Sequence, residues 1–379
     1  MLAWTRLLTP VFSLLMLAGT SAGQDAPNIA RGLITHQDLF NATMREGVAC
    51  YRIPALATAP DGSLVAAMDE RVGSCDDLGT NKDINIVARR STDDGMTWSA
   101  IETVVDYDHG ISASDPSMIV DRKTGEILLF YNYMDHNAEH GIYYLHVTRS
   151  RDNGVSWTKA EDITSQITRP GWRRDFAFIT SGNGIQTRSG TLLHTLVNLD
   201  KGLHVFGRAD DAKTWFLVEA PLKPGDESRV VELADGAWMV NSRVKGKGMR
   251  YVHTSADRGK TWRTAPEPAL PDPACNASLI RCTSVADGYN KNRLLFSNAN
   301  SRKARRNMTV RVSYDEGTSW TDGKTIYAGE AAYSSLTMLR NGDIGLLFEK
   351  NDYRENVFVR FSIEWLTDGK DRYEAPQPR

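Results

Sequence analysis

An octet repeated along the chain constrains the fold more than any other feature of this sequence. The pattern Ser-x-Asp-x-Gly-x-Thr/Ser-Trp occurs at residues 91–98, 150–157, 255–262 and 313–320. A fifth copy at 208–215 keeps Asp210, Thr214 and Trp215 but has Ala212 in place of the glycine. The five tryptophans lie 59, 58, 47 and 58 residues apart, which indicates one supersecondary unit per period.

The octet has the composition of a tight hairpin turn. Its aspartate can accept backbone N–H bonds, its glycine can adopt a positive φ, and its tryptophan can cover the base of the unit. We interpret the octets as structural. The alternative, that their aspartates are catalytic acids or calcium ligands, is disfavoured because five turns spread around a ring cannot line one site.

Short runs of strand-forming residues separate the octets, and no long helical periodicity interrupts them. These runs include residues 84–89, 127–133, 142–149, 237–243 and 344–348. Four short strands in each unit of about fifty residues predict an all-β fold, a six-bladed β-propeller. The sequence leaves open whether the first and last strands close one blade together.

The N-terminus has the features of a secretory signal at residues 1–23. Arg6 precedes an apolar run at 7–18 and a small-residue stretch at 19–23. A membrane anchor is the alternative, although the apolar run is short for a span. We expect residues 24–379 to form a single catalytic propeller that is secreted to the periplasm or the extracellular space and has no membrane span.

Charge and cysteine usage narrow the remaining classes. With 45 basic and 47 acidic residues, the net charge of −2 gives no general electrostatic attraction to nucleic acid.

The four cysteines allow three pairings, and we favour the local pairs Cys50 with Cys75 and Cys275 with Cys282. Neither Cys-x-x-Cys nor His-x-x-x-His spacing occurs, so we expect no metal and no cofactor. We also expect a monomer.

Three arginines stand beside strand patterns: Arg52, Arg243 and Arg305. An isolated arginine at such a place usually forms a surface ion pair. Three that converge repel one another unless an anion completes the cluster, and a substrate carboxylate fits the guanidinium fork. The arginines therefore favour a ligand that carries a carboxylate.

Several segments in a fixed order resemble the exo-sialidases, in particular the bacterial type, a family of retaining glycoside hydrolases with Asp-box repeats. The resemblance covers residues 47–365 and rests on the repeated octets and on Tyr-Arg-Ile-Pro at 51–54, Asp-Glu-Ser-Arg-Val-Val-Glu-Leu at 226–233 and Ala-Ala-Tyr-Ser-Ser-Leu at 331–336. It implies an exo-α-sialidase that removes terminal sialic acid from glycoproteins, glycolipids and oligosaccharides. A trans-sialidase, a non-catalytic sialic-acid-binding propeller and a purely structural propeller are the alternatives.

The resemblance also implies roles for individual residues. Arg52, Arg243 and Arg305 would form the triad that grips the sialic acid carboxylate, with Arg302 and Arg306 as alternatives to the third. Tyr333 would be the nucleophile and Glu227 its base. A neutral phenol avoids the repulsion that an anionic nucleophile would meet at a carboxylate-bearing sugar, and nearby arginines are expected to favour the phenolate.

The remaining implied roles concern acidic residues and a fourth arginine. Asp77 would be the acid/base, with Asp76 as the alternative. Arg71 would face the 4-hydroxyl of the sugar, and Glu349 would orient Arg52. Asp115 would line the N-acetyl and glycerol side of the pocket, against the alternative of a turn cap. The nearby apolar residues Met118, Trp172 and Phe176 either line the pocket for the acetyl methyl group or pack between blades, and we expect packing.

Overall fold

The structure is a computed structural model that describes residues 28–210 and 212–376. The expected signal at 1–23 lies outside the described residues. Strands dominate the described ranges, and the helical segments are short: η1 (Ala42–Met44), α1 (Thr164–Ile167), η2 (Val285–Asp287) and α2 (Ile363–Leu366). None of the helices described is long and apolar enough to cross a membrane. The expected all-β class is confirmed.

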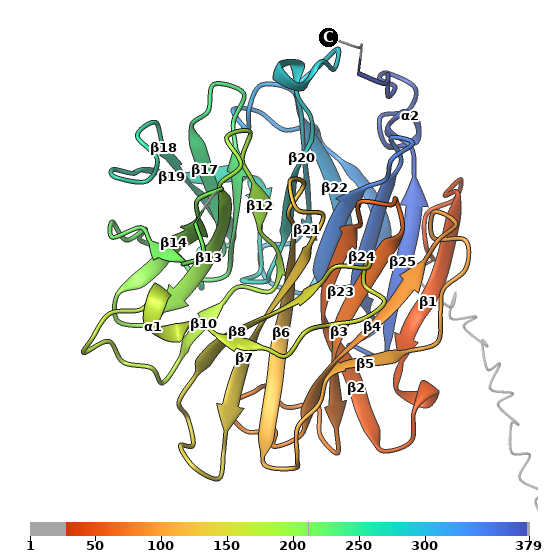
Figure 1. The fold of residues 1–379 in the computed structure, drawn as a ribbon. Helices are drawn as coiled ribbons and strands as arrows, with labels where there is room; N and C mark the ends of the chain where they lie inside the picture. The colour runs from red at the N-terminus through yellow and green to blue at the C-terminus, as the bar shows by residue number, and fades with distance from the viewer. Residues whose placement is uncertain (1–27, 211, 377–379) are drawn as a thin grey trace, which may run out of the picture.

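Four antiparallel sheets follow one another along the chain (Figure 1). The first contains β2 (Val48–Thr58), β3 (Leu64–Val72), β4 (Ile84–Ser91) and β5 (Glu102–Val105). The second contains β6 (Ile111–Val120), β7 (Ile127–Asp135), β8 (Tyr144–Ser150) and β9 (Glu161–Asp162), with β11 (Gly182–Asn183) parallel to β6. The third contains β10 (Ala177–Ile179), β13 (Leu192–Asn198), β14 (Gly202–Arg208) and β15 (Phe216–Leu217), with β12 (Ile185–Gln186) beside β13. The fourth contains β16 (Ser228–Glu232), β17 (Trp238–Ser242), β18 (Met249–Ser255) and β19 (Arg263–Pro271).

The last sheet joins the two ends of the described chain. It contains, in spatial order, β1 (Thr35–Asn41), β25 (Glu355–Phe361), β24 (Ile344–Lys350), β23 (Lys324–Met338), β22 (Arg306–Ser313), β21 (Arg293–Ala299) and β20 (Ser278–Thr283). The long strand β23 pairs with β22 through its first half and with β24 through its second half. Because β1 pairs with β25, the first strand completes the sheet that the last strands build. The sequence alone leaves this closure open.

The inner strands of successive sheets contact one another around a closed circuit. β2 contacts β6 and β23, β12 contacts β6 and β13, and β16 contacts β13 and β20, which in turn contacts β23. Apolar clusters fill the spaces between neighbouring sheets, as where Leu56 of β2 and Leu347 of β24 share one core. Loops at one end of these inner strands therefore converge on a common axis.

Each complete octet forms the same hydrogen-bonded turn. In the first, Gly95 N donates to Ser91 Oγ (2.9 Å), and Asp93 accepts bonds from Thr97 N (2.8 Å) and Thr97 Oγ1 (2.6 Å). The turns around Asp152, Asp257 and Asp315 repeat these bonds. These bonds lower the pKa of Asp93 to about 2. The aspartates are occupied as turn acceptors, which confirms the structural interpretation.

The glycine and the tryptophan of the octet have the expected places. Gly95 has a φ of 83°, and a Cβ there would collide with the ring of Phe358. Trp98 packs edge-on against the same ring, with 5.0 Å between ring centroids. The first octet therefore fastens the first sheet to the last one.

The prediction of a Cys275–Cys282 disulfide is wrong, because both thiols are free and buried. Cys282 lies in β20, where its Sγ contacts Met338 Sδ at 3.5 Å. Cys275 packs in a separate cluster with Ile53 and Tyr333. Seven residues of nearly extended chain span roughly 20 Å, far beyond the Cα separation of about 6 Å that a disulfide needs. Short sequence spacing was therefore a poor guide to pairing.

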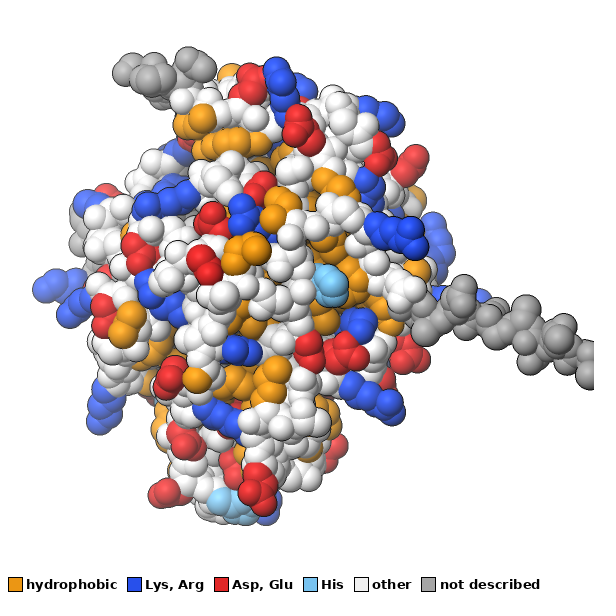
Figure 2. All heavy atoms as spheres, turned by 90° about the vertical axis from the view of Figure 1, so that its right-hand side faces the viewer, with side chains coloured by type: hydrophobic (Ala, Val, Ile, Leu, Met, Phe, Trp, Pro, Cys, Tyr) orange, Lys and Arg blue, Asp and Glu red, His pale blue; other side chains and the backbone are white. Residues whose placement is uncertain are grey.

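Acidic and basic side chains are mixed on the face of the molecule that lies on the right-hand side of Figure 1. Figure 2 shows this face, where both charge signs mix with small apolar groups. Neither acidic nor basic side chains dominate the part of this face that the structure describes. Charge that attracts a ligand must therefore be concentrated at one site.

His194 on β13 is buried, and two hydrogen bonds fix its neutral form. Thr195 N donates to Nδ1 (2.7 Å), so Nε2 carries the proton and faces Ser117 Oγ at 2.9 Å. Burial, with the nearby charge of Arg229, lowers the His194 pKa to about 3. In the unfolded chain the imidazole takes up a second proton, and becomes charged, near pH 6.5. The stability that His194 contributes is therefore complete above that pH and is lost as the pH falls below it.

We expect the contribution of His194 to the free energy of unfolding to fall by about 2 kcal/mol between pH 7 and pH 5. Urea unfolding of His194→Gln should therefore show a pH dependence that is shallower by this amount. His36→Gln, an exposed change on β1, is the matched control and should keep the wild-type dependence. Identical dependences in wild type and His194→Gln would contradict the prediction.

Candidate active site

Bulges in three inner strands point the predicted site residues toward one end of the axis. The pairing register shifts between Arg52 and Ala55 in β2, between Ser114 and Ser117 in β6, and between Ala331 and Ser334 in β23. Ile53 and Asp115 in two of these bulges have φ values of 62° and 63°, which are unusual for residues other than glycine. Bulges redirect side chains and are common beside active sites.

A cavity of about 170 Å³ opens at this end of the axis. Eight of the nine predicted site residues line it: Arg52, Arg71, Asp77, Asp115, Glu227, Arg243, Arg305 and Tyr333. The ninth, Glu349, lies directly behind Arg52. Residues on or beside four of the five sheets, from positions almost 300 apart in the chain, therefore meet at one site.

Glu349 on β24 holds the first arginine in place. Arg52 Nε donates to Glu349 Oε1 (2.9 Å), and Arg52 Nη2 lies 3.4 Å from Oε2. The carboxylate also accepts the backbone N–H groups of Ile53 and Tyr333, each at 2.9 Å. Burial alone would raise the pKa of Glu349, but Arg52 and these bonds hold it below its usual range. Glu349 therefore stays ionised and fixes both Arg52 and the backbone of Tyr333.

Tyr333, Glu227 and Arg243 form a closed triangle of contacts. The Tyr333 hydroxyl donates to Glu227 Oε2 (2.8 Å) and accepts from Arg243 Nη1 (3.0 Å), while the same Arg243 nitrogen also contacts Glu227. Burial and the Glu227 charge raise the pKa of Tyr333 well above its usual value, despite Arg243 and Arg305. Arg243 and Arg305 lower the pKa of Tyr333 and so favour the phenolate, as expected, but burial and the Glu227 charge outweigh them. The hydrogen bond nevertheless gives the phenol proton a direct path to Glu227.

The structure selects Arg305 among the three candidates for the third arginine. Its guanidinium carbon lies 5.3 Å from the centroid of the Tyr333 ring, and its side chain lines the cavity. Arg302 is exposed and bonds the carbonyl of Gly248, whereas Arg306 is exposed outside this cavity. Arg52, Arg243 and Arg305 therefore surround the phenol.

Arg71 connects the cavity to the loop that carries Asp77. Arg71 is 1% exposed, and its Nη1 donates to Asp77 Oδ1 (2.8 Å) and to the carbonyl of Cys75 (2.9 Å). Asp77 also lies 3.7 Å from Arg52. Partial burial would raise the pKa of Asp77, but Arg71 and then Arg52 lower it below its usual value. Asp76 and Asp77 are both exposed, but of the two only Asp77 lines the cavity and contacts Arg71, which favours Asp77.

Asp115 lies in the β6 bulge and not in a turn, so the turn-cap alternative is wrong. Its carboxylate accepts from Asn132 Nδ2 (3.0 Å), and its backbone N–H donates to Asp69 Oδ1 (2.9 Å). Burial, followed by the charges of Asp69 and Glu227, raises the pKa of Asp115 well above its usual value. Asp69 is itself buried against Arg71, and burial raises its pKa to about 6. Asp115 therefore presents a carboxyl group that readily holds a proton.

One wall of the cavity is apolar, and no sequence motif predicts it. Cavity-lining residues without a predicted role there include Leu78, Tyr143, Phe178, Ser114 and Asp226. Phe176, for which we expected packing, also lines the cavity and is 43% exposed. Met118 and Trp172 pack in apolar clusters, as expected. Nothing in the local sequence marks the missed residues, because tertiary contacts alone place them together.

The predicted Cys50–Cys75 disulfide is present, with 5.6 Å between the two Cα atoms. It joins β2, two residues before Arg52, to the loop two residues before Asp77.

Removing it in a Cys50→Ser/Cys75→Ser variant should lower the free energy of unfolding by about 3 kcal/mol, the usual value for a loop of this length. We also expect kcat to fall more than the affinity for substrate, because the Asp77 loop loses a tether.

Thermal unfolding and steady-state kinetics test this prediction. Cys282→Ser, which removes a free thiol away from the candidate site, is the control for the loss of a cysteine side chain. An unchanged kcat in the double variant would show that Arg71 alone holds the loop.

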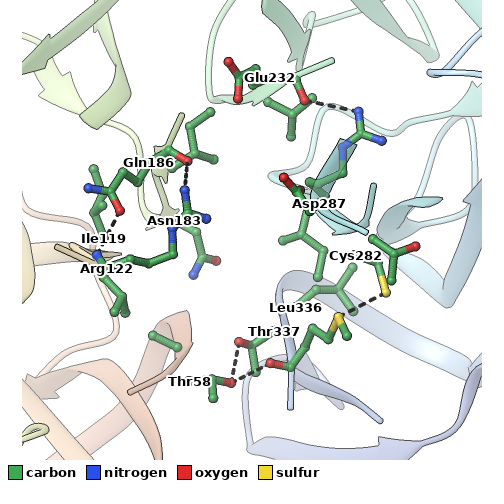
Figure 3. A pocket seen from close by; sticks show the side chains of 18 of the residues that line it. Thr58, Ile119, Arg122, Asn183, Gln186, Glu232, Cys282, Asp287, Leu336 and Thr337 are labelled. Carbon is green, nitrogen blue, oxygen red and sulfur yellow. Dashed lines mark hydrogen bonds between the residues drawn. The ribbon is translucent and has the colours of Figure 1, made fainter. Parts of the chain in front are cut away.

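A larger cavity of about 820 Å³ lies where the inner strands end at Thr58, Ile119 and Thr337, and it contains none of the predicted site residues (Figure 3). Its arginines have partners: Arg188 lies 3.9 Å from Glu232. Arg281 is paired with Glu316, and Arg122 bonds the carbonyl of Gln186. We therefore assign the candidate site to the smaller cavity.

Comparison with known proteins agrees with this geometry. Residues 62–346 match the model of the BNR repeat-like domain. The chain is 36% identical to a sialidase of Micromonospora viridifaciens, over 95% of this chain and 59% of that protein. It is 30% identical to an exo-alpha-sialidase of Aspergillus fumigatus, over 85% of this chain and 86% of that protein. The chain belongs to the sialidase family.

Solved structures place the sialidase fold over most of the chain. The Hadza microbial sialidase Hz136 superposes with a TM-score of 0.75 at 29% identity, over 85% of this chain and 67% of that one. At 20% identity, a leech intramolecular trans-sialidase superposes with a TM-score of 0.73 and shows the fold alone. The shared fold is a β-propeller. The chain spans about three fifths of the sialidases of M. viridifaciens (59%) and Bacteroides fragilis (60%).

Proposed function

We propose that the chain is an exo-α-sialidase that hydrolyses terminal sialic acid α-ketosides of glycoproteins, glycolipids and oligosaccharides with retention of configuration. One observation carries this proposal: three guanidinium groups surround a phenol that is hydrogen-bonded to a carboxylate, at the open end of a ring of strands. A sugar that carries a carboxylate on its reactive carbon fits this arrangement, because the guanidinium groups can bind the carboxylate while the phenol attacks the carbon. The relatives named sialidases support the same substrate class.

Arg52, Arg243 and Arg305 would hold the sugar carboxylate. Guanidinium forks match carboxylates in shape and charge, and Glu349 prevents Arg52 from turning away. The bound anion would offset the repulsion among the three cations. Arg71 and Asp115 would contact other polar groups of the sugar from the neighbouring wall of the cavity.

Tyr333 would attack the anomeric carbon. As its oxygen bonds to that carbon, its proton would pass to Glu227 along the existing 2.8 Å hydrogen bond. The leaving oxygen would take a proton from Asp77, and the bond between sugar and aglycone would break. Water would then attack the tyrosyl adduct with Asp77 as base, and Tyr333 would recover its proton from Glu227.

Substrate binding would prepare Asp77 for its role as acid. Arg71 and Arg52 favour the ionised form of Asp77. A substrate carboxylate bound to Arg52 would compete for that positive charge and add a negative one, so the pKa of Asp77 should rise in the complex. The same binding event would therefore position the sugar and promote protonation of its acid.

We further propose that residues 24–379 form one six-bladed propeller behind a cleaved leader, secreted as a monomer. Six groups of antiparallel strands support the blade number if β23 is shared between the two groups of the large sheet. The apolar run after Arg6 supports secretion.

A fluorogenic aryl α-sialoside assay and α2,3-sialyllactose hydrolysis test the proposed function. We expect release of free sialic acid, first as the α-anomer in NMR spectra. An aryl β-galactoside, which lacks the carboxylate, is the matched control and should not be cleaved. Release of no sialic acid from either substrate would overturn the proposal, and transfer to added lactose in place of hydrolysis would identify a trans-sialidase.

A further inference from the structure

Tyr353 lies in a turn between β24 and β25 with an unusual backbone. Asn351, Asp352 and Tyr353 have φ values of 52°, 52° and 66°, three consecutive left-handed residues of which none is glycine. Such conformations persist only where surrounding contacts enforce them, and they concentrate at functional sites. The turn therefore holds the side chain of Tyr353 in one position, at the energetic cost of three strained residues.

A network on the far side of the turn enforces this backbone. Asn351 N donates to the carbonyl of Glu330 (3.0 Å), and Asn351 Nδ2 donates to Glu355 Oε1 (2.8 Å). The hydroxyl of Tyr327 donates to Asn351 Oδ1 (2.5 Å). Asn351 is thus bonded through both its backbone and its side chain, and the turn is anchored independently of the cavity.

The Tyr353 side chain contacts two of the three arginines at once. The guanidinium carbon of Arg52 lies over its ring, 3.8 Å from the centroid, and Arg305 Nη1 donates to its hydroxyl at 3.0 Å. Tyr353 does not line the catalytic cavity itself. It lines a neighbouring groove of about 830 Å³, with Arg305 bordering both spaces.

The two arginines depend on Tyr353 to different degrees. Arg52 has Glu349 as an anionic partner. Arg305 forms no ion pair with a carboxylate among the described residues, and its other hydrogen bond is a long one of 3.5 Å to the carbonyl of Ala274. The Tyr353 hydroxyl is therefore the main acceptor for Arg305, while its ring stabilises Arg52 by a cation–π contact.

We infer that Tyr353 is a positioning residue that sets the spacing of Arg52 and Arg305 for a bound carboxylate. This inference rests on the proposed function. One aromatic side chain contacts both cations, so it restricts the rotation of each guanidinium group and fixes the distance between them. The site would thereby be organised before the anion arrives, and binding would lose less side-chain entropy.

Binding of N-acetylneuraminic acid and of its methyl ester, measured by ligand-observed NMR, tests the inference. Tyr353→Phe keeps the ring and removes the acceptor of Arg305, so affinity for the acid should fall about tenfold. Tyr353→Leu removes both contacts and should cost more, on the order of a hundredfold. Because the ester carries no charge for the arginines to hold, its affinity should change less than about twofold in both variants.

Three outcomes separate this inference from its alternatives. Loss of affinity for the acid and the ester in equal proportion would show a merely structural role and overturn the inference. Unchanged binding of the acid in both variants would also overturn it, while the proposed function would stand. Failure of the wild type to bind the acid would overturn both. Tyr251→Phe on β18 is the matched control, and thermal unfolding checks that Tyr353→Phe folds.

Discussion

Tyr333→Phe should reduce kcat by at least about 10³-fold, since losing a covalent nucleophile costs even more in a serine protease. The substitution removes one oxygen that bonds Glu227 and Arg243, and it leaves the ring beneath Arg52 and Arg305. The carboxylate clamp should therefore survive. We expect the affinity for N-acetylneuraminic acid to change only a few-fold, so the loss should appear in kcat and not in binding.

Covalent labelling provides a second readout for Tyr333. With a 2,3-difluorosialic acid as the reagent, intact mass spectrometry should show one sugar adduct on the wild type, and peptide mapping should locate it at Tyr333. The Tyr251→Phe control should label normally. An adduct that persists in Tyr333→Phe would contradict the assignment of the nucleophile.

Asp77→Ala should lower kcat/KM for sialyllactose by about 10² to 10⁴, the usual contribution of a general acid. A sugar alkoxide is a poor leaving group and needs a proton. An aryl sialoside releases a stabilised phenolate, so its cleavage should fall much less. This dependence on the leaving group separates loss of the acid from loss of substrate binding.

Asp76→Ala is the matched control for Asp77→Ala. Both residues follow Cys75 on the same loop, but the Asp76 side chain is exposed outside the cavity, whereas Asp77 lines it and contacts Arg71. We expect Asp76→Ala to retain activity with both substrates. A large loss in Asp76→Ala together with an active Asp77→Ala would reverse the assignment.

Burial and neighbouring charges shift the pKa values of Tyr333 and Asp77. The pKa of Tyr333 is raised by burial and by Glu227, and that of Asp77 is lowered chiefly by Arg71. Each shift opposes the proposed role of its group. A bound carboxylate would reduce the effective positive charge at Asp77, and the developing positive charge on the sugar would favour the phenolate. Catalysis would therefore depend on charge that the substrate itself brings.

Local sequence patterns determine much of the architecture. The octet fixes its own turn, because Asp93 and Thr97 are four residues apart and their hydrogen bonds are local. Four such turns with short strands between them favour a closed arrangement of small sheets. The site residues of the family could also be located, since Arg52 and Tyr333 lie in short recognisable segments.

Only the tertiary structure decided how distant segments meet. Arg52 and Glu349, which form an ion pair, are 297 residues apart in the chain. The strands β1 and β25, which lie near opposite ends of the chain, pair with each other. The free thiols of Cys275 and Cys282 and the placement of Tyr353 behind two arginines likewise follow from which strands are neighbours. The physical reason is that hydrogen bonds within a turn depend on a few adjacent residues, whereas burial and charge at the cavity are sums over side chains from every sheet around it.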